Sequence, residues 1–201
     1  KKVVISLGGS VIIPDNVDYT YLKKFSRLIK KFTKKDKIII VTGGGKTARR
    51  YIEPLLKLKV GDKISSLIGI AATRLNARLV SGIFKSKTKI PETVKEVKNL
   101  LRKNNLVICG ALGSKPGRTS DANAVEVAKE IKADFFLNIT NIGGLYTKNP
   151  STNKSARFIP REGYDNFLKR VNRIKFKAGQ HYVLDQVAAK IIKKYKVKTY
   201  I

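Results

Sequence analysis

The chain has 201 residues, of which 42% are hydrophobic, a size and composition that allow one domain with a substantial buried core. Its single cysteine, Cys109, and single histidine, His181, exclude an intrachain disulfide and a Cys/His zinc site built by one chain. No apolar stretch approaches the roughly 18 residues of a membrane span, and the basic start runs straight into glycines, unlike a signal peptide. We therefore expect a cytoplasmic protein with one domain over residues 1–201 and no membrane partner.

Charge is the most unusual property of the composition. Forty-three Lys and Arg face 14 Asp and Glu, for a formal net charge of +29. Such a field attracts polyanions, of which nucleic acid is the commonest. The alternative is a solvated lysine-rich surface, although such surfaces normally carry many glutamates as well. Several lysines also fall where helices are expected to end, so part of the clustering complements helix dipoles.

Short apolar runs alternate with amphipathic segments along the chain, which predicts an α/β fold with a mainly parallel sheet. The predicted elements are, in order, a strand at 2–7, a helix at 18–33, a strand at 37–42, helices at 46–57, 62–83 and 91–103, strands at 105–110 and 134–140, and a closing strand at 196–201. Another helix starts at Ser120, and a last one carries an apolar side from Val183 to Ile192. Cys109 lies within a predicted strand and is expected to be a buried small hydrophobe.

Three loops rich in small residues each follow a predicted strand and precede a helix. They are Gly8-Gly9-Ser10, Gly43-Gly44-Gly45 and the loop that leads to Thr119-Ser120-Asp121. Ligands of open α/β sheets bind beyond the carboxyl ends of the strands, and free amides at a helix start suit a phosphate oxygen. The alternative is that the glycines only make tight turns. Three such loops at one sheet edge would form an anion site.

The segment VTGGGKTARRYIE, residues 41–53, looks like half of a P-loop. The full pattern requires a glycine where this chain has Ile40, so the P-loop interpretation fails. One of Arg49 and Arg50 could bind a phosphate, while the other is expected to pair with Glu53. Asp121 stands out because carboxylates are rare here. It is either a helix N-terminal charge or a group that orients a lysine or Mg²⁺ beside phosphates.

The chain resembles the amino-acid-kinase superfamily, and within it the archaeal type of UMP kinase. The matching segments occur in family order and cover nearly the whole chain: ISLGGSVIIPD, VTGGGKTARRYIE, LIGIAATRLNA, GRTSDANAV, ITNIGGLYTKNP and KAGQHYVLDQVAAKII. The resemblance implies a three-layer αβα sandwich around a mainly parallel sheet. It also implies a transferase of pyrimidine biosynthesis that passes the γ-phosphoryl group of ATP to UMP, with Mg²⁺ accompanying ATP. Relatives usually continue through a last strand and helix, which we expect this chain to lack.

The resemblance also assigns roles to particular residues. On the ATP side it places Gly8, Gly9 and Ser10, together with Thr140, Asn141 and Tyr146. It places the phosphate-binding glycines Gly43, Gly44 and Gly45 between the donor and acceptor phosphates. UMP would contact Arg49, Ser66, Thr119 and Ser120, the last two through backbone amides. Asp121 would organise the catalytic centre, with no metal site built by the protein alone. Relatives are commonly homo-oligomers.

Most departures from the family pattern replace a carboxylate side chain with an uncharged residue. Ser66, Gly143 and Asn149 stand where relatives usually carry carboxylates, and Arg118 stands where histidine is common. Two hypotheses therefore remain open. The chain is a working UMP kinase, as the intact loops with Arg49 and Asp121 indicate. Alternatively, it is a degenerate paralogue that binds RNA, for example on a ribosome, as the net charge and the lost carboxylates suggest.

Overall fold

The computed structural model describes residues 1–113, 119–173 and 184–201. Its five-stranded parallel sheet has the order β3-β2-β1-β4-β5 and consists of β1 (Lys2–Leu7), β2 (Lys37–Thr42), β3 (Leu106–Cys109), β4 (Phe135–Ile139) and β5 (Thr199–Tyr200). At the centre, Val4 is in register with Ile39 of β2 and Phe136 of β4. Because all strands are parallel, their carboxyl ends and the loops that follow them meet at one edge.

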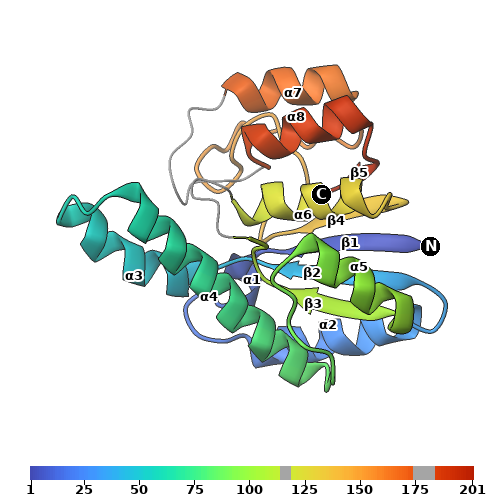
Figure 1. Cartoon of the computed structure of the whole chain (residues 1–201). Coiled ribbons are helices and arrows are strands. Elements are labelled where there is room, and N and C mark those ends of the chain that lie inside the picture. The colour runs from blue at the N-terminus through green and yellow to red at the C-terminus, as the bar shows by residue number, and fades with distance from the viewer. Residues whose placement is uncertain (114–118, 174–183) are drawn as a thin grey trace.

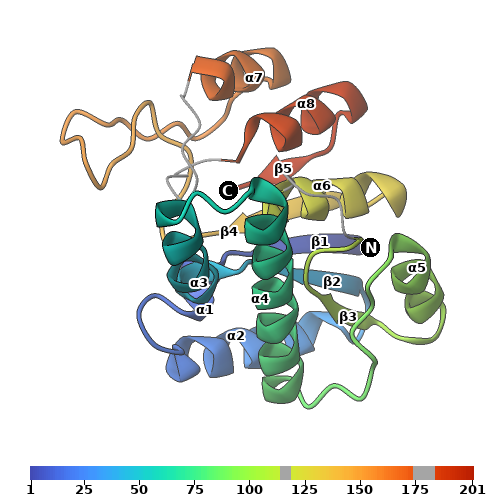
Figure 2. The ribbon, with the colours of Figure 1, turned by 60° about the vertical axis from the view of Figure 1, so that its left-hand side comes forward.

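Helices cover both faces of this sheet, which confirms the predicted α/β sandwich (Figure 1). The helices are α1 (Gly9–Ile12), α2 (Tyr19–Phe32), α3 (Gly45–Lys57), α4 (Asp62–Ile83), α5 (Val94–Lys103), α6 (Ser120–Glu130), α7 (Tyr164–Arg173) and α8 (Gln186–Tyr195). One core joins the sheet to α1, α2 and α4, and the other joins it to α5, α6, α7 and α8. The two layers are visible on either side of the strands in Figure 2.

Alternation along the strands decides which side chain enters which core. Val3 and Ile5 of β1 pack towards α2 and α4, whereas Val4 packs towards α6 and α8. Ser6, two residues after Val4, is fully buried on the same face of the sheet as Val4. Cys109 is also fully buried, as predicted, and burial raises the pKa of its thiol to about 12.

Two predicted helix starts were wrong. The helix predicted from Pro91 begins at Val94, because Thr93 and Glu96 form a reciprocal capping box that fixes its first turn. The last helix begins at Gln186 and is capped by the side chain of Asp185, so Leu184 lies before it. Val183 falls outside the described residues.

Other differences concern short or unpredicted elements. Helices α1 and α7 were not predicted: α1 has only four residues, while α7 has an amphipathic signal in Phe167 and Val171, both buried one turn apart. The closing strand shrinks from 196–201 to Thr199–Tyr200. On α2, Leu28 is 52% exposed although the sequence pattern placed it on the apolar face.

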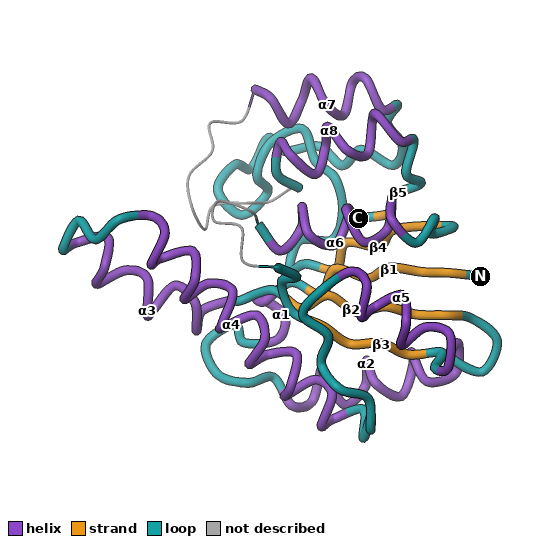
Figure 3. Tube along the Cα trace, in the orientation of Figure 1, coloured by secondary structure: helices purple, strands orange, loops and turns teal. Residues whose placement is uncertain are grey.

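Helix α4 is long and crosses much of the molecule, as the tube in Figure 3 shows. Of the part of the chain that the structure describes, only the segment of α4 is long and apolar enough to cross a membrane by length and composition. Ala77 and Val80 of this helix are fully buried against the sheet, whereas Ile64, Leu67 and Leu75 are 50%, 43% and 56% exposed.

The core assignment predicts a clear contrast between two isoleucines. Ile39→Ala in β2, where the side chain is fully buried, should cost about 2–5 kcal/mol of unfolding free energy because it leaves a cavity. Ile64→Ala in α4, where half of the side chain is exposed, should change stability by less than about 1 kcal/mol. Urea unfolding of both variants tests this, and equal losses would contradict the assignment.

Candidate active site

Two of the predicted phosphate loops meet backbone to backbone at the carboxyl edge of the sheet. A Cβ atom placed on Gly9 would lie 2.0 Å from the amide nitrogen of Gly45, and one on Gly43 would lie 2.6 Å from that of Gly9. Gly45 also has a φ of +61°, a conformation that L side chains rarely adopt. The contact therefore requires glycines on both sides, and it places the starts of α1 and α3 side by side.

Helix α4 holds the second glycine loop in place. The side-chain amide of Asn76 donates hydrogen bonds to the carbonyls of Gly43 at 2.7 Å and Gly44 at 3.2 Å. Nearby, the carbonyl of Thr73 accepts a bond from Thr42 at 2.8 Å, and its hydroxyl accepts one from the Ala111 amide at 2.8 Å.

Both α4 side chains are almost fully buried, and the sequence analysis gave neither a role. The signal was present in Thr73 and Asn76 themselves, which are two polar residues on the buried face of a largely apolar helix.

The lysine of the GGGKT segment does not behave as a P-loop lysine. Lys46 forms an ion pair with Asp15 on the loop before α2. Ile40, where the P-loop would need glycine, is fully buried in β2. The N-cap residues of α1 and α3 are Gly8 and Gly44, which have no side chain to accept a hydrogen bond from the first-turn amides.

The first glycine loop also joins the loop that follows β4. The amide of Gly8 donates to the carbonyl of Ile139 at 2.8 Å, which ties the two strand ends together. The hydroxyls of Ser10 and Thr140 both donate to the side-chain oxygen of Asn141, at 3.4 and 3.2 Å. The structure thus gathers three residues predicted on the ATP side.

Tyr146 lies further along this loop, where it packs edge-on against Phe158 at 5.5 Å between ring centroids. An isolated antiparallel bridge joins the same two residues.

Asp121 lies in the first turn of α6 and faces the end of β1. The buried hydroxyl of Ser6 donates to a carboxylate oxygen of Asp121 at 2.8 Å. Burial raises the pKa of the Asp121 carboxyl to about 6, with a smaller contribution from the charge of Asp185, and the Ser6 hydrogen bond opposes the shift. Asp121 therefore changes protonation close to neutral pH, as functional carboxylates often do.

Asp185 is a second carboxylate at this edge that the sequence analysis missed. It is only 4% exposed, and it caps α8 by accepting bonds from the amides of Val187 at 2.7 Å and Ala188 at 3.0 Å. It also accepts the hydroxyl hydrogen of Thr119, the cap of α6. An aspartate directly before an amphipathic run is a helix-start signal, and that signal could have indicated the cap.

Two residues that the resemblance assigned to UMP lie on helices α3 and α4. Arg49 is exposed on α3, and the pair expected between Glu53 and an arginine is replaced by Glu53 with Lys57 at 2.8 Å. Ser66 is partly buried on α4, one turn before Gly69, whose carbonyl approaches Gly44. Arg118 and His181 lie outside the described residues.

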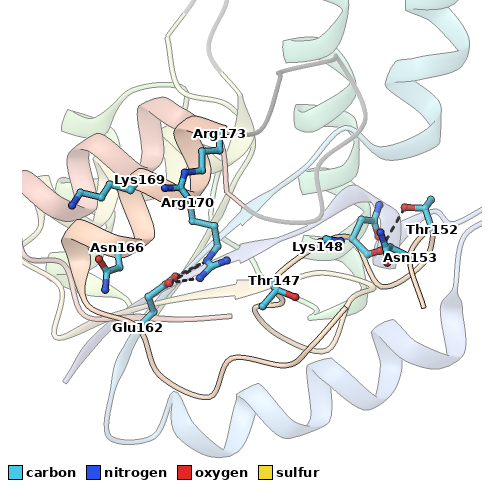
Figure 4. A pocket seen from close by; sticks show the side chains of 10 residues that line it. Thr147, Lys148, Thr152, Asn153, Glu162, Asn166, Lys169, Arg170 and Arg173 are labelled. Carbon is cyan, nitrogen blue, oxygen red and sulfur yellow. Dashed lines mark hydrogen bonds and ion pairs between the residues drawn. The ribbon is translucent and has the colours of Figure 1, made fainter. Parts of the chain in front are cut away.

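A polar cavity of about 570 Å³ borders the loop that follows Tyr146 (Figure 4). Its lining residues include Asn149 and the basic side chains Lys148, Lys169, Arg170 and Arg173. Glu162, the one acidic lining residue, is held by Arg170 at 2.6 Å. Within the described ranges, no group of three or more His, Cys, Asp or Glu could hold a metal ion.

Comparison with known proteins gives a consistent result. The sequence profile of the Amino acid kinase family matches residues 1–201. The "Uridylate kinase" of Archaeoglobus fulgidus is 39% identical over 201 residues, which are all of this chain and 90% of that protein, and the one of Thermoplasma volcanium is 36% identical over 202 aligned positions, 88% of that protein.

Solved structures agree with the sequence matches. The crystal structure of the Archaeoglobus fulgidus uridylate kinase matches with a TM-score of 0.88 at 37% identity, covering all of this chain and 89% of the other. The UMP kinase of Bacillus anthracis matches with a TM-score of 0.81 at 22% identity, covering 99% of this chain and 85% of the other, a likeness of fold.

Close backbone contact predicts opposite effects for two glycine substitutions. Gly9→Ala should destabilise the protein by well over about 1 kcal/mol, because its methyl group would overlap the backbone of Gly45. Gly82→Ala should be neutral or stabilising by about 0.5–1 kcal/mol, since it lies in α4 with nothing within 4 Å of its Cβ position. Thermal unfolding measures both. A tolerated Gly9→Ala would disprove the contact.

The raised pKa of Asp121 predicts that replacing this residue stabilises the protein in a pH-dependent way. Because the folded state holds the proton of Asp121 more tightly than the unfolded state, the contribution of Asp121 to stability should fall as pH rises from about 4 to 6. Asp121→Asn should therefore be more stable than wild type at pH 8, by on the order of 2 kcal/mol, and lose this advantage near pH 4.

Urea unfolding at both pH values measures the effect. Asp165→Asn is the control, because Lys193 lowers the pKa of the exposed Asp165 and its removal should bring no gain at pH 8. Equal behaviour of the two variants would contradict the buried environment of Asp121.

Proposed function

Because this chain belongs to the amino acid kinase family, we propose that it is a UMP kinase, which transfers the γ-phosphoryl group of ATP to UMP and gives UDP and ADP. The observation that carries the proposal is the convergence of both glycine loops and Asp121 at one sheet edge. The match to uridylate kinases over all 201 residues of this chain supports the same substrates. Phosphoryl transfer mainly requires positioning and charge neutralisation, which such an edge supplies.

The donor side is proposed at the loops after β1 and β4. Gly8, Gly9 and Ser10 would present amides and a hydroxyl to the ATP phosphates, where α1 begins without a side-chain cap. Thr140 and Asn141 would lie beside them, because the hydroxyls of Ser10 and Thr140 both donate to the side-chain oxygen of Asn141. Tyr146 would border the rest of the nucleotide.

The acceptor side is proposed between α3, α4 and α6. Arg49 would bind the UMP phosphate, and Ser66 would face the nucleoside with a hydroxyl in place of the usual carboxylate. Thr119 and Ser120 would offer backbone amides at the start of α6. The glycines Gly43, Gly44 and Gly45 would lie between the two phosphates, held there by Asn76.

Mg²⁺ would enter with ATP as part of the substrate and would supply positive charge that neutralises the phosphates. Asp121 would organise the centre in its ionised form. Its pKa of about 6 then implies that activity falls below about pH 6.

We also propose one domain over residues 1–201, a cytoplasmic location and a homo-oligomeric state. The RNA- or ribosome-binding alternative gains no support from the relatives, which are uridylate kinases. Its remaining basis is the net charge of +29. Of the positions with replaced carboxylates, Asn149 keeps a polar side chain at the cavity of Figure 4, whereas Gly143 has none.

The first test is UMP-dependent ADP formation with Mg·ATP in about 0.5 M salt, which removes bound nucleic acid. We expect turnover within the roughly 1–10³ s⁻¹ range of ordinary enzymes. Asp121→Asn should lower turnover far more than it lowers ATP affinity. Wild-type turnover no higher than that of the folded variant would overturn the kinase assignment, and an equal loss of turnover and ATP affinity would contradict the organising role.

A further inference from the structure

One buried carboxylate joins the starts of two neighbouring helices, α6 and α8, which pack side by side in Figures 1 and 2. Asp185 uses both of its oxygens. Oδ1 accepts from the amides of Val187 and Ala188 at 2.7 and 3.0 Å, and Oδ2 accepts from the hydroxyl of Thr119. The hydroxyl oxygen of Thr119 in turn accepts from the amide of Ala122 at 3.1 Å. A single side chain thus caps α8 and fixes the residue that caps α6.

This geometry limits what the Thr119 side chain can do. A hydroxyl has one hydrogen to donate, and that of Thr119 is given to Asp185. A phosphate oxygen accepts hydrogen bonds, so the side chain of Thr119 has nothing left to offer it. Any phosphate at this helix start would depend on backbone amides and hence on the exact placement of the first turn.

The opposite side of the same turn is held by β1. The fully buried hydroxyl of Ser6 donates to Asp121 at 2.8 Å, two residues after Thr119. The first turn of α6 is therefore fastened to α8 through Asp185 and to the sheet through Ser6. Leu184, which precedes Asp185, is 2% exposed and anchors the carboxylate in the core.

We propose that Asp185 is a positioning residue of the kinase site, which holds the first turn of α6 in place for the acceptor phosphate by fixing Thr119. The inference rests on the proposed function, since it names a supporting residue for that site. Burial of a carboxylate is costly unless its oxygens are satisfied, and here three donors satisfy them. A helix cap alone would need only one of the two oxygens.

Asp185→Asn separates capping from positioning. Asparagine is as good a helix cap as aspartate, so its oxygen can keep the bonds to Val187 and Ala188. Its amide nitrogen, however, can only donate, so the hydroxyl hydrogen of Thr119 loses its acceptor, and a neutral hydrogen bond in the opposite direction replaces the stronger bond to a carboxylate. The variant therefore should fold with α8 intact while the link to α6 is weakened.

Kinetics of five variants test the link. Asp185→Asn and Thr119→Val should each lower kcat/KM for UMP by about 10- to 100-fold, with the KM for ATP within about twofold of wild type. The double variant should lose no more than Thr119→Val alone, because Asp185→Asn acts on a contact that Thr119→Val already removes. Thr119→Ser keeps the hydroxyl and should be close to wild type. Thr93→Ala, which removes the cap of the remote α5, should leave activity unchanged.

Wild-type kinetics of Asp185→Asn, or losses that multiply in the double variant, would overturn the proposal. Amide hydrogen exchange provides a readout that does not depend on turnover. In Asp185→Asn the amide of Ala122 should exchange about tenfold faster, while those of Val187 and Ala188 stay as protected as in wild type. Unchanged exchange at Ala122 would refute the positioning role even in an active enzyme. A wild-type protein that makes no UDP, but shows the expected exchange, would instead refute only the kinase assignment.

Discussion

The contact between the main chains of Gly9 and Gly45 is the constraint on which the rest of the site depends. Strands β1 and β2 are neighbours, so the loops that leave their carboxyl ends reach the same space. A Cβ on either glycine would collide with the other loop, and only bare backbone lets α1 and α3 begin side by side. The carbonyls of Gly43 and Gly44 then need partners, because buried backbone groups are rarely left unpaired. Asn76 supplies them, which explains a buried amide on an apolar helix.

Electrostatics divide this chain into two regimes. The molecule as a whole has a net charge of +29, yet the two carboxylates at the carboxyl edge, Asp121 and Asp185, are held by hydroxyls and amides. Among the described residues, their hydrogen-bond partners are uncharged. Arg49 stays exposed on α3, without an ion-pair partner among the described residues, at the edge where phosphates would arrive. Neutral partners therefore keep these two acids in place.

The sequence predicted those parts of this arrangement that depend on residues close to one another along the chain. The long helix α4 and strands β1 and β2 were predicted well, because their apolar periodicity extends over many residues. The glycine loops and Asp121 were also found, since each follows a strand and starts a helix. The start of α5 was misplaced because a local capping box, rather than Pro91, decides it. Helix α7 was missed although its apolar spacing was present.

The sequence by itself determined the elements, their mainly parallel order and the loops at which a phosphate site would form, because these follow from patterns among near neighbours. Only the tertiary structure decided which polar side chains support that site. Asn76 acts on Gly43 across 33 positions, Asp185 on Thr119 across 66, and Ser6 on Asp121 across 115. The raised pKa of Asp121 has the same origin, since burial by distant segments causes it. Such hydrogen bonds and burial arise only when the chain is folded, so no local pattern contains them.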